Sequence, residues 1–305
     1  MNEPSFLNFD FAPVGLEHYR ILTEFLKQYP QSLSGYTMAT LLAWNPTYSY
    51  EWVFADSETL LLSCIPYPET NRHLMQSIGP LAAEIQERII TAAGSLTYPL
   101  KMVCVTRSFV RGNPELLRSF TCQENRSFSN YLYRTDALAR LRGRKYSKKR
   151  NLLSQASSQY TWVCKPLTEV ETDACFEVLD TIEEEEQPLI EGMLEREITA
   201  LQYTLKNFNA LHQQGLLIFI DDTPVAFSIF EEISPTTVAI HFERALRRFK
   251  GLYQVINWET SKIIAEQGYE YINREEDLGD RGLRNAKKSY HPIRIIPALE
   301  LTRIC

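Results

Sequence analysis

The chain has 305 residues, of which 44% are hydrophobic and 23% charged, and its formal net charge is −6. This composition excludes a disordered or fibrous chain, and the length suggests two domains or one large one. The charge is uneven, because residues 1–150 hold 17 Lys and Arg against 13 Asp and Glu, whereas residues 151–305 hold 15 against 25. The negative average therefore does not by itself exclude a phosphate-bearing partner.

The N-terminus and the cysteines predict a cytoplasmic protein. The opening sequence MNEPSFLNFDFAPVG has neither the basic nor the apolar region of a secretory signal, and no apolar run approaches the roughly 18 residues that span a bilayer. The six cysteines include no Cys-x-x-Cys pair, and we expect core thiols at Cys64, Cys104 and Cys164, which lie in apolar runs. The five histidines lack metal-ligand spacing, so no catalytic metal is predicted.

Apolar spacing in the first half predicts alternating helices and strands. The expected order is helices at 16–26 and 35–44, strands at 50–55 and 59–65, a helix at 81–93, a strand at 102–106, a short helix at 113–119 and a strand at 130–134.

The second half gives a clearer pattern. Thr168 and Glu171 have the spacing of a capping box at the start of a helix. The expected order is helices at 168–182 and 194–211, strands at 216–220, 225–231 and 237–244, a helix at 252–267, a strand at 269–273, a helix at 280–290 and a strand at 293–302. The turns between the first three strands are too short for crossovers, so these strands should be antiparallel, whereas the later strand–helix–strand connection can be parallel.

The two halves share a similar order of elements, which suggests two copies of one fold. We therefore expect a first domain at residues 1–137, a basic linker or helix at 138–160, and a second domain at 161–305. The expected fold class is α/β (α+β), with a mixed, mostly antiparallel sheet flanked by helices in each domain.

The block from Asn273 to Pro292, together with residues 133–138 and 241–245, resembles a bacterial family of uncharacterised proteins. That family is grouped with the C-terminal catalytic domain of phosphatidylglycerol lysyltransferase. The resemblance implies two tandem Gcn5-related N-acyltransferase-like (GNAT-like) domains. It also implies a donor substrate, aminoacyl-tRNA or acyl-CoA, and no tightly bound cofactor. One departure is the acidic stretch at 275–277, where the lysyltransferase is expected to have an apolar pattern. A membrane surface would be a partner only if the acceptor is a lipid.

A basic loop precedes the helix at 252–267 and is the candidate site for donor phosphates. Free N–H groups at a helix start and nearby cations together favour phosphate. The candidate residues are Arg247, Arg248, Lys250 and Gly251. Acyltransferases of the resembling fold hold the pyrophosphate of coenzyme A on an Arg/Gln-x-x-Gly-x-Gly/Ala loop, which Arg248 and Gly251 match and Tyr253 does not. The alternative is a solvated basic turn.

A second basic segment holds seven cations and no acid within residues 140–150. We expect it to bind a nucleic acid or a smaller anion through Arg142, Arg144, Lys145, Lys148 and Lys149. Helical spacing would place Arg142, Lys145 and Lys149 on one face, and a base could stack on Tyr146. The alternative is a solvated helix between two domains.

Acid–base candidates gather where the strand at 269–273 ends, since ligands tend to bind at the carboxyl ends of strands in open sheets. Three adjacent acids at 275–277 repel one another, so we expect at least one of them to have a raised pKa or a cationic partner. We expect Glu275 or Asp277 to accept a proton, with Arg284 and Lys287 as supporting ion pairs. An ion-pair network that only fixes the following helix is the alternative.

Further candidates are His241 and Glu243, which lie two residues apart on one expected strand and should face the same side. Glu243 is an alternative proton acceptor, and Asn273 and Tyr290 would orient the acceptor by hydrogen bonds. The leading hypothesis is an acyl- or aminoacyltransferase that acts on an amine or hydroxyl. The rivals are a non-catalytic tandem GNAT-like binding protein and an RNA-binding module that uses residues 140–150.

Overall fold

The computed structural model describes residues 5–186 and 192–304. The chain forms two compact units, one of Met1–Asn130 with Ile296–Cys305 and one of Tyr131–Ile295. This division differs from the expected domains at 1–137 and 161–305, because the chain returns to the first unit at its end. The segment expected to link two domains, 138–160, lies inside the second unit.

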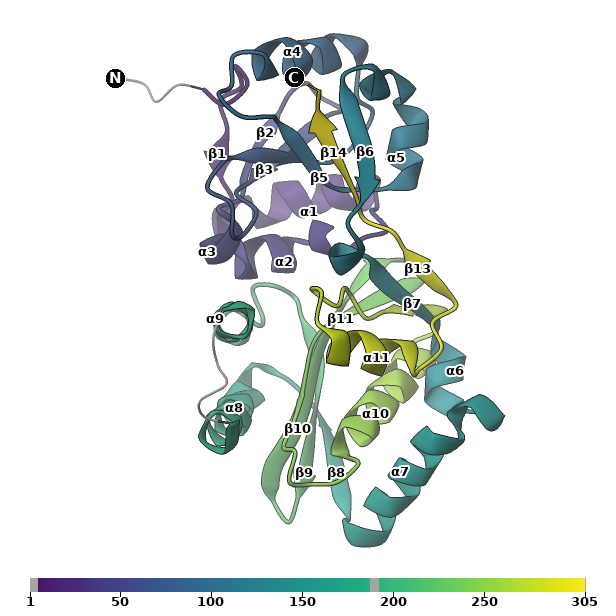
Figure 1. Cartoon of the computed structure of the whole chain (residues 1–305). Helices are drawn as coiled ribbons and strands as arrows, with labels where there is room; N and C mark the ends of the chain where they lie inside the picture. The colour runs from purple at the N-terminus through teal and green to yellow at the C-terminus, as the bar shows by residue number, and fades with distance from the viewer. Residues whose placement is uncertain (1–4, 187–191, 305) are drawn as a thin grey trace. The chain divides into compact units, whose positions relative to one another are not determined.

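The first unit contains a seven-stranded sheet in the order β1-β2-β3-β4-β5-β14-β6 (Figure 1). Its strands are β1 (Ala12–Pro13), β2 (Glu51–Phe54), β3 (Leu60–Cys64), β4 (His73–Met75), β5 (Lys101–Val105), β6 (Phe120–Glu124) and β14 (Leu299–Arg303). β4 and β5 are parallel, and the other pairs are antiparallel. Its helices are α1 (Tyr19–Gln28), α2 (Met38–Ala43), α3 (Asn45–Tyr48), α4 (Ala83–Ala93) and α5 (Arg107–Gly112). Short 3₁₀ turns cover Leu16–His18, Ser34–Tyr36, Pro114–Arg118 and Arg126–Phe128.

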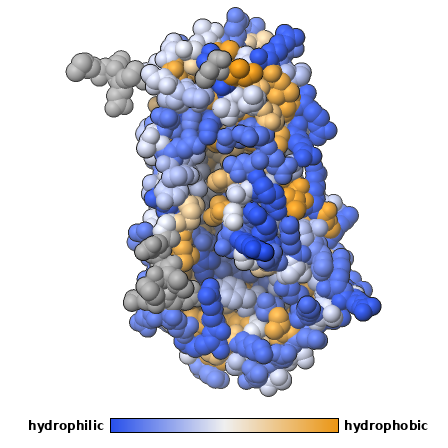
Figure 2. Space-filling model, in the orientation of Figure 1, coloured by the Kyte–Doolittle hydropathy of each residue, from blue (hydrophilic) through white to orange (hydrophobic). Residues whose placement is uncertain are grey.

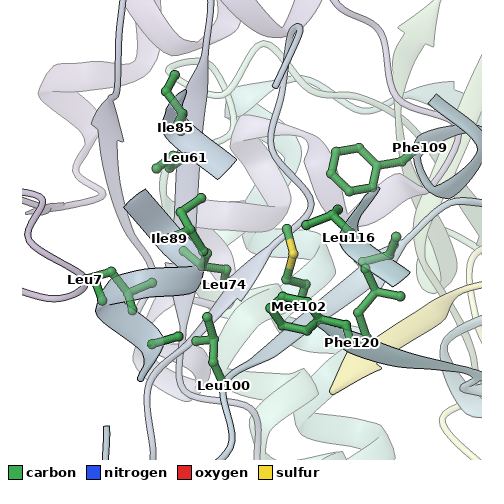
Figure 3. Packing of buried hydrophobic residues seen from close by; sticks show 14 of the residues in the cluster. Leu7, Leu61, Leu74, Ile85, Ile89, Leu100, Met102, Phe109, Leu116 and Phe120 are labelled. Atoms are coloured by element: carbon green, nitrogen blue, oxygen red, sulfur yellow. The ribbon is translucent and has the colours of Figure 1, made fainter. Parts of the chain in front are cut away.

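A hydrophobic cluster joins this sheet to α4. Ile85 and Ile89, four residues apart on one face of α4, pack with Leu74 and Met102 of the parallel strands (Figure 3). Each of these side chains is at most 8% exposed. The amphipathic spacing of α4 therefore fixes the helix against the centre of the sheet.

The second unit contains another seven-stranded sheet, in the order β13-β7-β12-β11-β10-β9-β8. Its strands are β7 (Asn130–Arg134), β8 (Trp162–Pro166), β9 (Gln214–Ile220), β10 (Thr223–Ser234), β11 (Thr237–Ala245), β12 (Tyr271–Asn273) and β13 (Arg294–Ile296). Its helices are α6 (Thr135–Arg140), α7 (Ser147–Gln159), α8 (Thr172–Glu186), α9 (Met193–Lys206), α10 (Leu252–Glu266) and α11 (Arg281–Lys288), with 3₁₀ turns at Arg144–Tyr146 and Glu169–Glu171. α8 and α10 lie on opposite faces of the sheet (Figure 1).

The expected fold class is confirmed, since each unit has a mixed sheet flanked by helices. β9, β10 and β11 are antiparallel neighbours, as the short turns between them predicted. β11 pairs with β12 in parallel, across a connection that contains a helix. The expected strand at 293–302 is instead two strands in different sheets, β13 and β14. β7, expected in the first copy, pairs with β12 of the second unit.

Smaller expectations also need correction. The short helix at 113–119 is a 3₁₀ turn, and β4 and β6 were not predicted. Cys64 is buried as expected, but Cys104 is only half-buried and Cys164 is exposed on β8, an edge strand of its sheet. The capping box of Thr168 and Glu171 is confirmed, with the Thr168 amide donating to Glu171 Oε2 at 3.2 Å.

No helix in the described part of the chain is both long and apolar enough to cross a membrane. On the face shown in Figure 2, hydrophilic side chains predominate and hydrophobic ones form small scattered groups.

Candidate active site at the ends of β11 and β12

The parallel pairing of β11 and β12 is short. It covers three residue pairs, from Thr237 with Tyr271 to Ala239 with Asn273, after which β12 ends and β11 continues to Ala245. The strand pairing thus stops before the carboxyl end of β11, and the carboxyl ends of strands are where open sheets tend to bind ligands. Several candidate catalytic residues lie beyond the last paired residues.

A β-bulge lies in the part of β11 beyond its pairing with β12. Ile229 of β10 pairs with Phe242 and Phe230 with Ile240, so His241 is an extra residue in β11. Bulges break the alternation of side chains and are common beside active sites. The bulge places His241 on the same face of the sheet as Glu231. Phe230, the residue before Glu231, points to the opposite face, where it packs with α10.

Glu243, in contrast, faces α10 and accepts a hydrogen bond from Asn257 Nδ2 at 3.3 Å. The expectation that His241 and Glu243 face the same side is therefore wrong. A spacing of two residues predicts a shared face only in a regular strand, and the bulge after Ile240 interrupts that regularity.

His241 lies between two carboxylates. Its Nε2 is 2.7 Å from Glu231 Oε1 and its Nδ1 is 2.7 Å from Glu275 Oε1, with 6% of the side chain exposed. Burial lowers the pKa of His241, but Glu275 and Glu231 outweigh this effect and raise the pKa to about 10. His241 is consequently an imidazolium at neutral pH, which suits it to hold negative charge in place and not to accept a proton.

Arg274 forms the second ion pair of the site. Its Nη2 lies 2.8 Å from Glu243 Oε1, and both side chains are less than 15% exposed. Consecutive loop residues, Arg274 and Glu275, thus reach opposite faces of β11 and bind Glu243 and His241 respectively. We use the name ionic cluster for Glu231, His241, Glu243, Arg274 and Glu275. Its formal charges sum to −1, from three carboxylates, one imidazolium and one guanidinium.

The loop after β12 is held by buried polar groups. Asn273 Oδ1 accepts from the Glu275 amide at 2.8 Å, and Glu275 adopts a left-handed backbone with a φ of 55°. Asp277 is fully buried and accepts from Tyr131 Oη at 2.5 Å, from the Gly279 amide at 3.0 Å, and from Arg284 Nη2 and Nε at 2.7 and 2.9 Å.

Both oxygens of Asp277 therefore accept hydrogen bonds, from the predicted partner Arg284 and from Tyr131 of β7 among others. Asp277 is 0% exposed, whereas the side chain of Glu243 is 11% exposed. The geometry therefore favours a structural role for Asp277, and its role in proton transfer stays a prediction. The other predicted partner, Lys287, bonds backbone oxygens instead. Its ammonium donates to the carbonyl oxygen of Arg274 at 2.5 Å and to that of Glu276. Burial lowers the pKa of Lys287.

Tyr290, the last of the predicted catalytic residues, is 5% exposed and packs near Arg274, whose guanidinium carbon is 5.2 Å from the ring centroid. Burial raises the pKa of Tyr290 to about 12, and Gln254 on α10 hydrogen-bonds the side chain. The structure therefore brings Glu243, Glu275, Asn273 and Tyr290 to one region, and their catalytic roles stay predictions.

Comparison with known proteins decides the family. The family described as phosphatidylglycerol lysyltransferase, C-terminal, matches residues 26–298. The chain belongs to this family. No protein with a curated description matches the chain.

Solved structures agree with this family. A conserved protein of unknown function from Bacteroides thetaiotaomicron is 27% identical, with a TM-score of 0.87 over 96% of this chain and 99% of that one. The C-terminal domain of a putative lysylphosphatidylglycerol synthetase from Agrobacterium fabrum is 12% identical, with a TM-score of 0.66 over 95% and 92%. L-PGS from Bacillus licheniformis is 13% identical, with a TM-score of 0.63 over 93% and 91%. The two latter structures show the shared fold alone.

The predicted phosphate loop of this lysyltransferase-family chain lies between β11 and α10. Arg247, Arg248 and Lys250 are exposed, and Arg248 is paired with Glu185 of α8. Gly251 has a φ of 87°, and a Cβ there would lie 2.7 Å from the carbonyl oxygen of Leu152 on α7. Packing against α7 thus explains this glycine without a ligand, and phosphate binding by the loop stays a prediction.

The basic segment at 140–150 is not one helix. α6 ends at Arg140, a 3₁₀ turn covers Arg144–Tyr146, and α7 begins at Ser147. Arg150 donates to the carbonyl oxygens of Leu141 and Gly143, which closes the intervening loop. The expected single helical face of Arg142, Lys145 and Lys149 is therefore wrong.

The basic side chains also differ in exposure. Arg142, Arg144, Lys145 and Lys148 are exposed, whereas Lys149 is half-buried. Tyr146 is 2% exposed and donates to the carbonyl oxygen of Tyr290 at 3.1 Å, so no base can stack on its ring as expected.

Four residues of the site were not predicted from the sequence: Glu231, Arg274, Tyr131 and Asn257. Asn257 carries a signal in the sequence, since it is a polar residue on the apolar face of a predicted helix and is 1% exposed. Tyr131 reaches the site only because β7 pairs with β12. In the described residues, no group of three His, Cys, Asp or Glu side chains could hold a metal ion.

Proposed function

We propose that this protein transfers an acyl or aminoacyl group from a phosphate-bearing donor, aminoacyl-tRNA or acyl-CoA, to an amine or hydroxyl. The observation that carries the proposal is the position of Glu243. Its carboxylate is held by Arg274 and Asn257 just beyond the paired part of β11 and β12, in a chain whose family is named for lysyl transfer.

Glu243 acts as the general base. Its carboxylate takes the proton as the amine or hydroxyl of the acceptor attacks the carbonyl carbon of the donor. The new C–N or C–O bond forms, the donor's ester or thioester bond breaks, and the proton passes to the leaving oxygen or sulfur. A positioned base contributes about 10²–10⁴-fold to such a reaction, and orientation of the two substrates contributes further.

The remaining candidates bind and orient. The net charge of −1 in the ionic cluster favours a cationic amino group, which Glu275 binds directly. Asn273 and Tyr290 orient the acceptor, and Arg247, Arg248 and Lys250 hold donor phosphates after Glu185 releases Arg248. Asp277, Arg284 and Lys287 keep the loop after β12 in place.

RNA binding by the basic segment is a second candidate function. Residues 140–150 hold six exposed cations and no acid, which favours contact with a phosphate backbone. Reversing the charge of Arg142, Lys145 and Lys148 should weaken tRNA binding and reduce its dependence on salt concentration. If tRNA affinity and its salt dependence are both unchanged, the segment does not bind RNA.

Transfer of label from aminoacyl-tRNA and from acyl-CoA to amine acceptors tests the reaction. Glu243→Gln should lower the rate at least about 100-fold, because an amide cannot accept the proton. Glu266→Gln, an exposed residue at the end of α10, is the matched control and should leave the rate unchanged. Equal rates for Glu243→Gln and the native protein would exclude Glu243 as the base.

A further inference from the structure

Lys149 has an unusual environment for a surface lysine. It lies in the first turn of α7, is half-buried, and its ammonium is 3.9 Å from the centroid of the Tyr290 ring. A cation in the first turn of a helix is unfavourable, because it adds to the positive end of the helix dipole. The adjacent Lys148 also lies in the first turn of α7, but its side chain is exposed to solvent.

A second cation lies close to the same ring. The guanidinium carbon of Arg274 is 5.2 Å from the Tyr290 centroid. Burial and the charge of Arg274 lower the pKa of Lys149 to about 8. Arg274 itself is bonded to the carboxylate of Glu243 at 2.8 Å. Across residues 5–186 and 192–304, no carboxylate forms an ion pair with Lys149.

Other groups around Lys149 do not neutralise it. Lys145 and Lys148 on its own side of the fold are cations, and Gln254 of α10 is a neutral amide that hydrogen-bonds Tyr290. Glu243 neutralises Arg274, but in the described residues no carboxylate pairs with Lys149, whose partly desolvated charge is repelled by Arg274. An anionic ligand would neutralise this second cation.

A neighbouring acceptor atom extends the site. Asn257 donates to Glu243 through Nδ2, but its Oδ1 is buried without a hydrogen-bond partner. A buried acceptor of this kind is destabilising unless a donor reaches it. Successive contacts join Lys149, the ring of Tyr290, Arg274, Glu243 and Asn257. The series begins with a cation and ends with oxygens that accept hydrogen bonds.

We infer that Lys149 and Arg274, on the ring of Tyr290, bind a carboxylate or phosphate group of a small substrate whose amine or hydroxyl is directed toward Glu243 and Asn257. The use of this anion site for an acceptor rests on the proposed function, but the anion site itself does not. The substrate class is an amino or hydroxy compound that carries an oxyanion.

Competitive labelling of lysines with trace acetic anhydride tests the anion site without any transfer assay. The native protein is labelled at pH 8 in chloride, inorganic phosphate or acetate of equal ionic strength. Lys149 is compared by mass spectrometry with Lys206, an exposed lysine at the end of α9. An anion on Lys149 that raises its pKa by one unit lowers the neutral fraction from about one half to about one tenth, so labelling slows about fivefold. Labelling of Lys206 should not change.

Slower labelling of Lys149 in phosphate alone identifies a phosphate site, and slower labelling in both anions identifies a general oxyanion site. Equal labelling of Lys149 in all three salts, or equal slowing at Lys206, would overturn the inference. As a second readout, phosphate should raise the melting temperature of the native protein and of Lys206→Gln, but not of Lys149→Gln. If the native protein shows no transfer activity but phosphate still slows the labelling of Lys149, the proposed function is contradicted and the anion site is supported.

Discussion

The charge on His241 is the most accessible consequence of the site geometry. Two carboxylates, each 2.7 Å from a ring nitrogen, raise its pKa from 6.5 to about 10. At 1.36 kcal/mol per pH unit this difference corresponds to an upper limit on the order of 5 kcal/mol of stabilisation. Little of that value is lost to solvent screening, because the side chain is 6% exposed.

The sign follows from proton binding. Above pH 6.5 the unfolded chain releases the proton of His241 while the native state keeps it, so the free energy of unfolding falls as pH rises from 6.5 to 10. The contribution is fully present below pH 6.5. The variant His241→Gln lacks this titration, and its free energy of unfolding should depend less on pH in the same window.

Imidazole NMR of the five histidines measures the effect directly. One signal should remain that of an imidazolium up to about pH 9, and His241→Gln should remove that signal. Glu231→Gln should lower the pKa of His241, because one of the two carboxylates loses its charge. If every histidine signal titrates between pH 5.5 and 7.5, the reasoning about the ionic cluster is refuted.

Three further predictions concern the support of the site, each measured by urea unfolding. Asp277→Asn should destabilise the protein by about 3–5 kcal/mol, because Arg284 loses a buried partner; a change below 1 kcal/mol would contradict the structural role. Tyr131→Phe should cost roughly 1.5–3 kcal/mol through the lost hydrogen bond to Asp277, and no loss would mean that β7 does not brace the loop. Gly251→Ala should lower the free energy of unfolding by about 1–3 kcal/mol, because of its backbone conformation and the clash with Leu152. An unchanged stability would mean that packing does not explain this glycine and would favour a role in ligand binding.

The sequence predicted the regular parts of the fold well. Helix α10 and strands β9, β10 and β11 carry long, consistent apolar patterns, and their short turns specify antiparallel pairing. The exchange of β7 and β14 between the two halves could not be predicted, because strand pairing over large sequence separations leaves no local pattern. β4 has only three residues, too few to show a period.

The candidate site was predicted in part for the same reasons. Clustered charge after β12 identified Asn273, Glu275 and Asp277, since such a run needs partners. The partners themselves came from elsewhere: Tyr131 from β7 and Glu231 from β10. The bulge at His241 has no sequence signature, and it decides which face of β11 each side chain occupies.

Donor binding is the most direct test of the central claim, that the second unit carries an acyl- or aminoacyl-transfer site. The melting temperature of the native protein is measured with acetyl-CoA, lysyl-tRNA and uncharged tRNA. A donor at about 100 times its Kd should stabilise the protein by roughly 2.7 kcal/mol and raise the midpoint, and charged tRNA should exceed uncharged tRNA if the aminoacyl group is bound. No shift with any of the three would contradict the account.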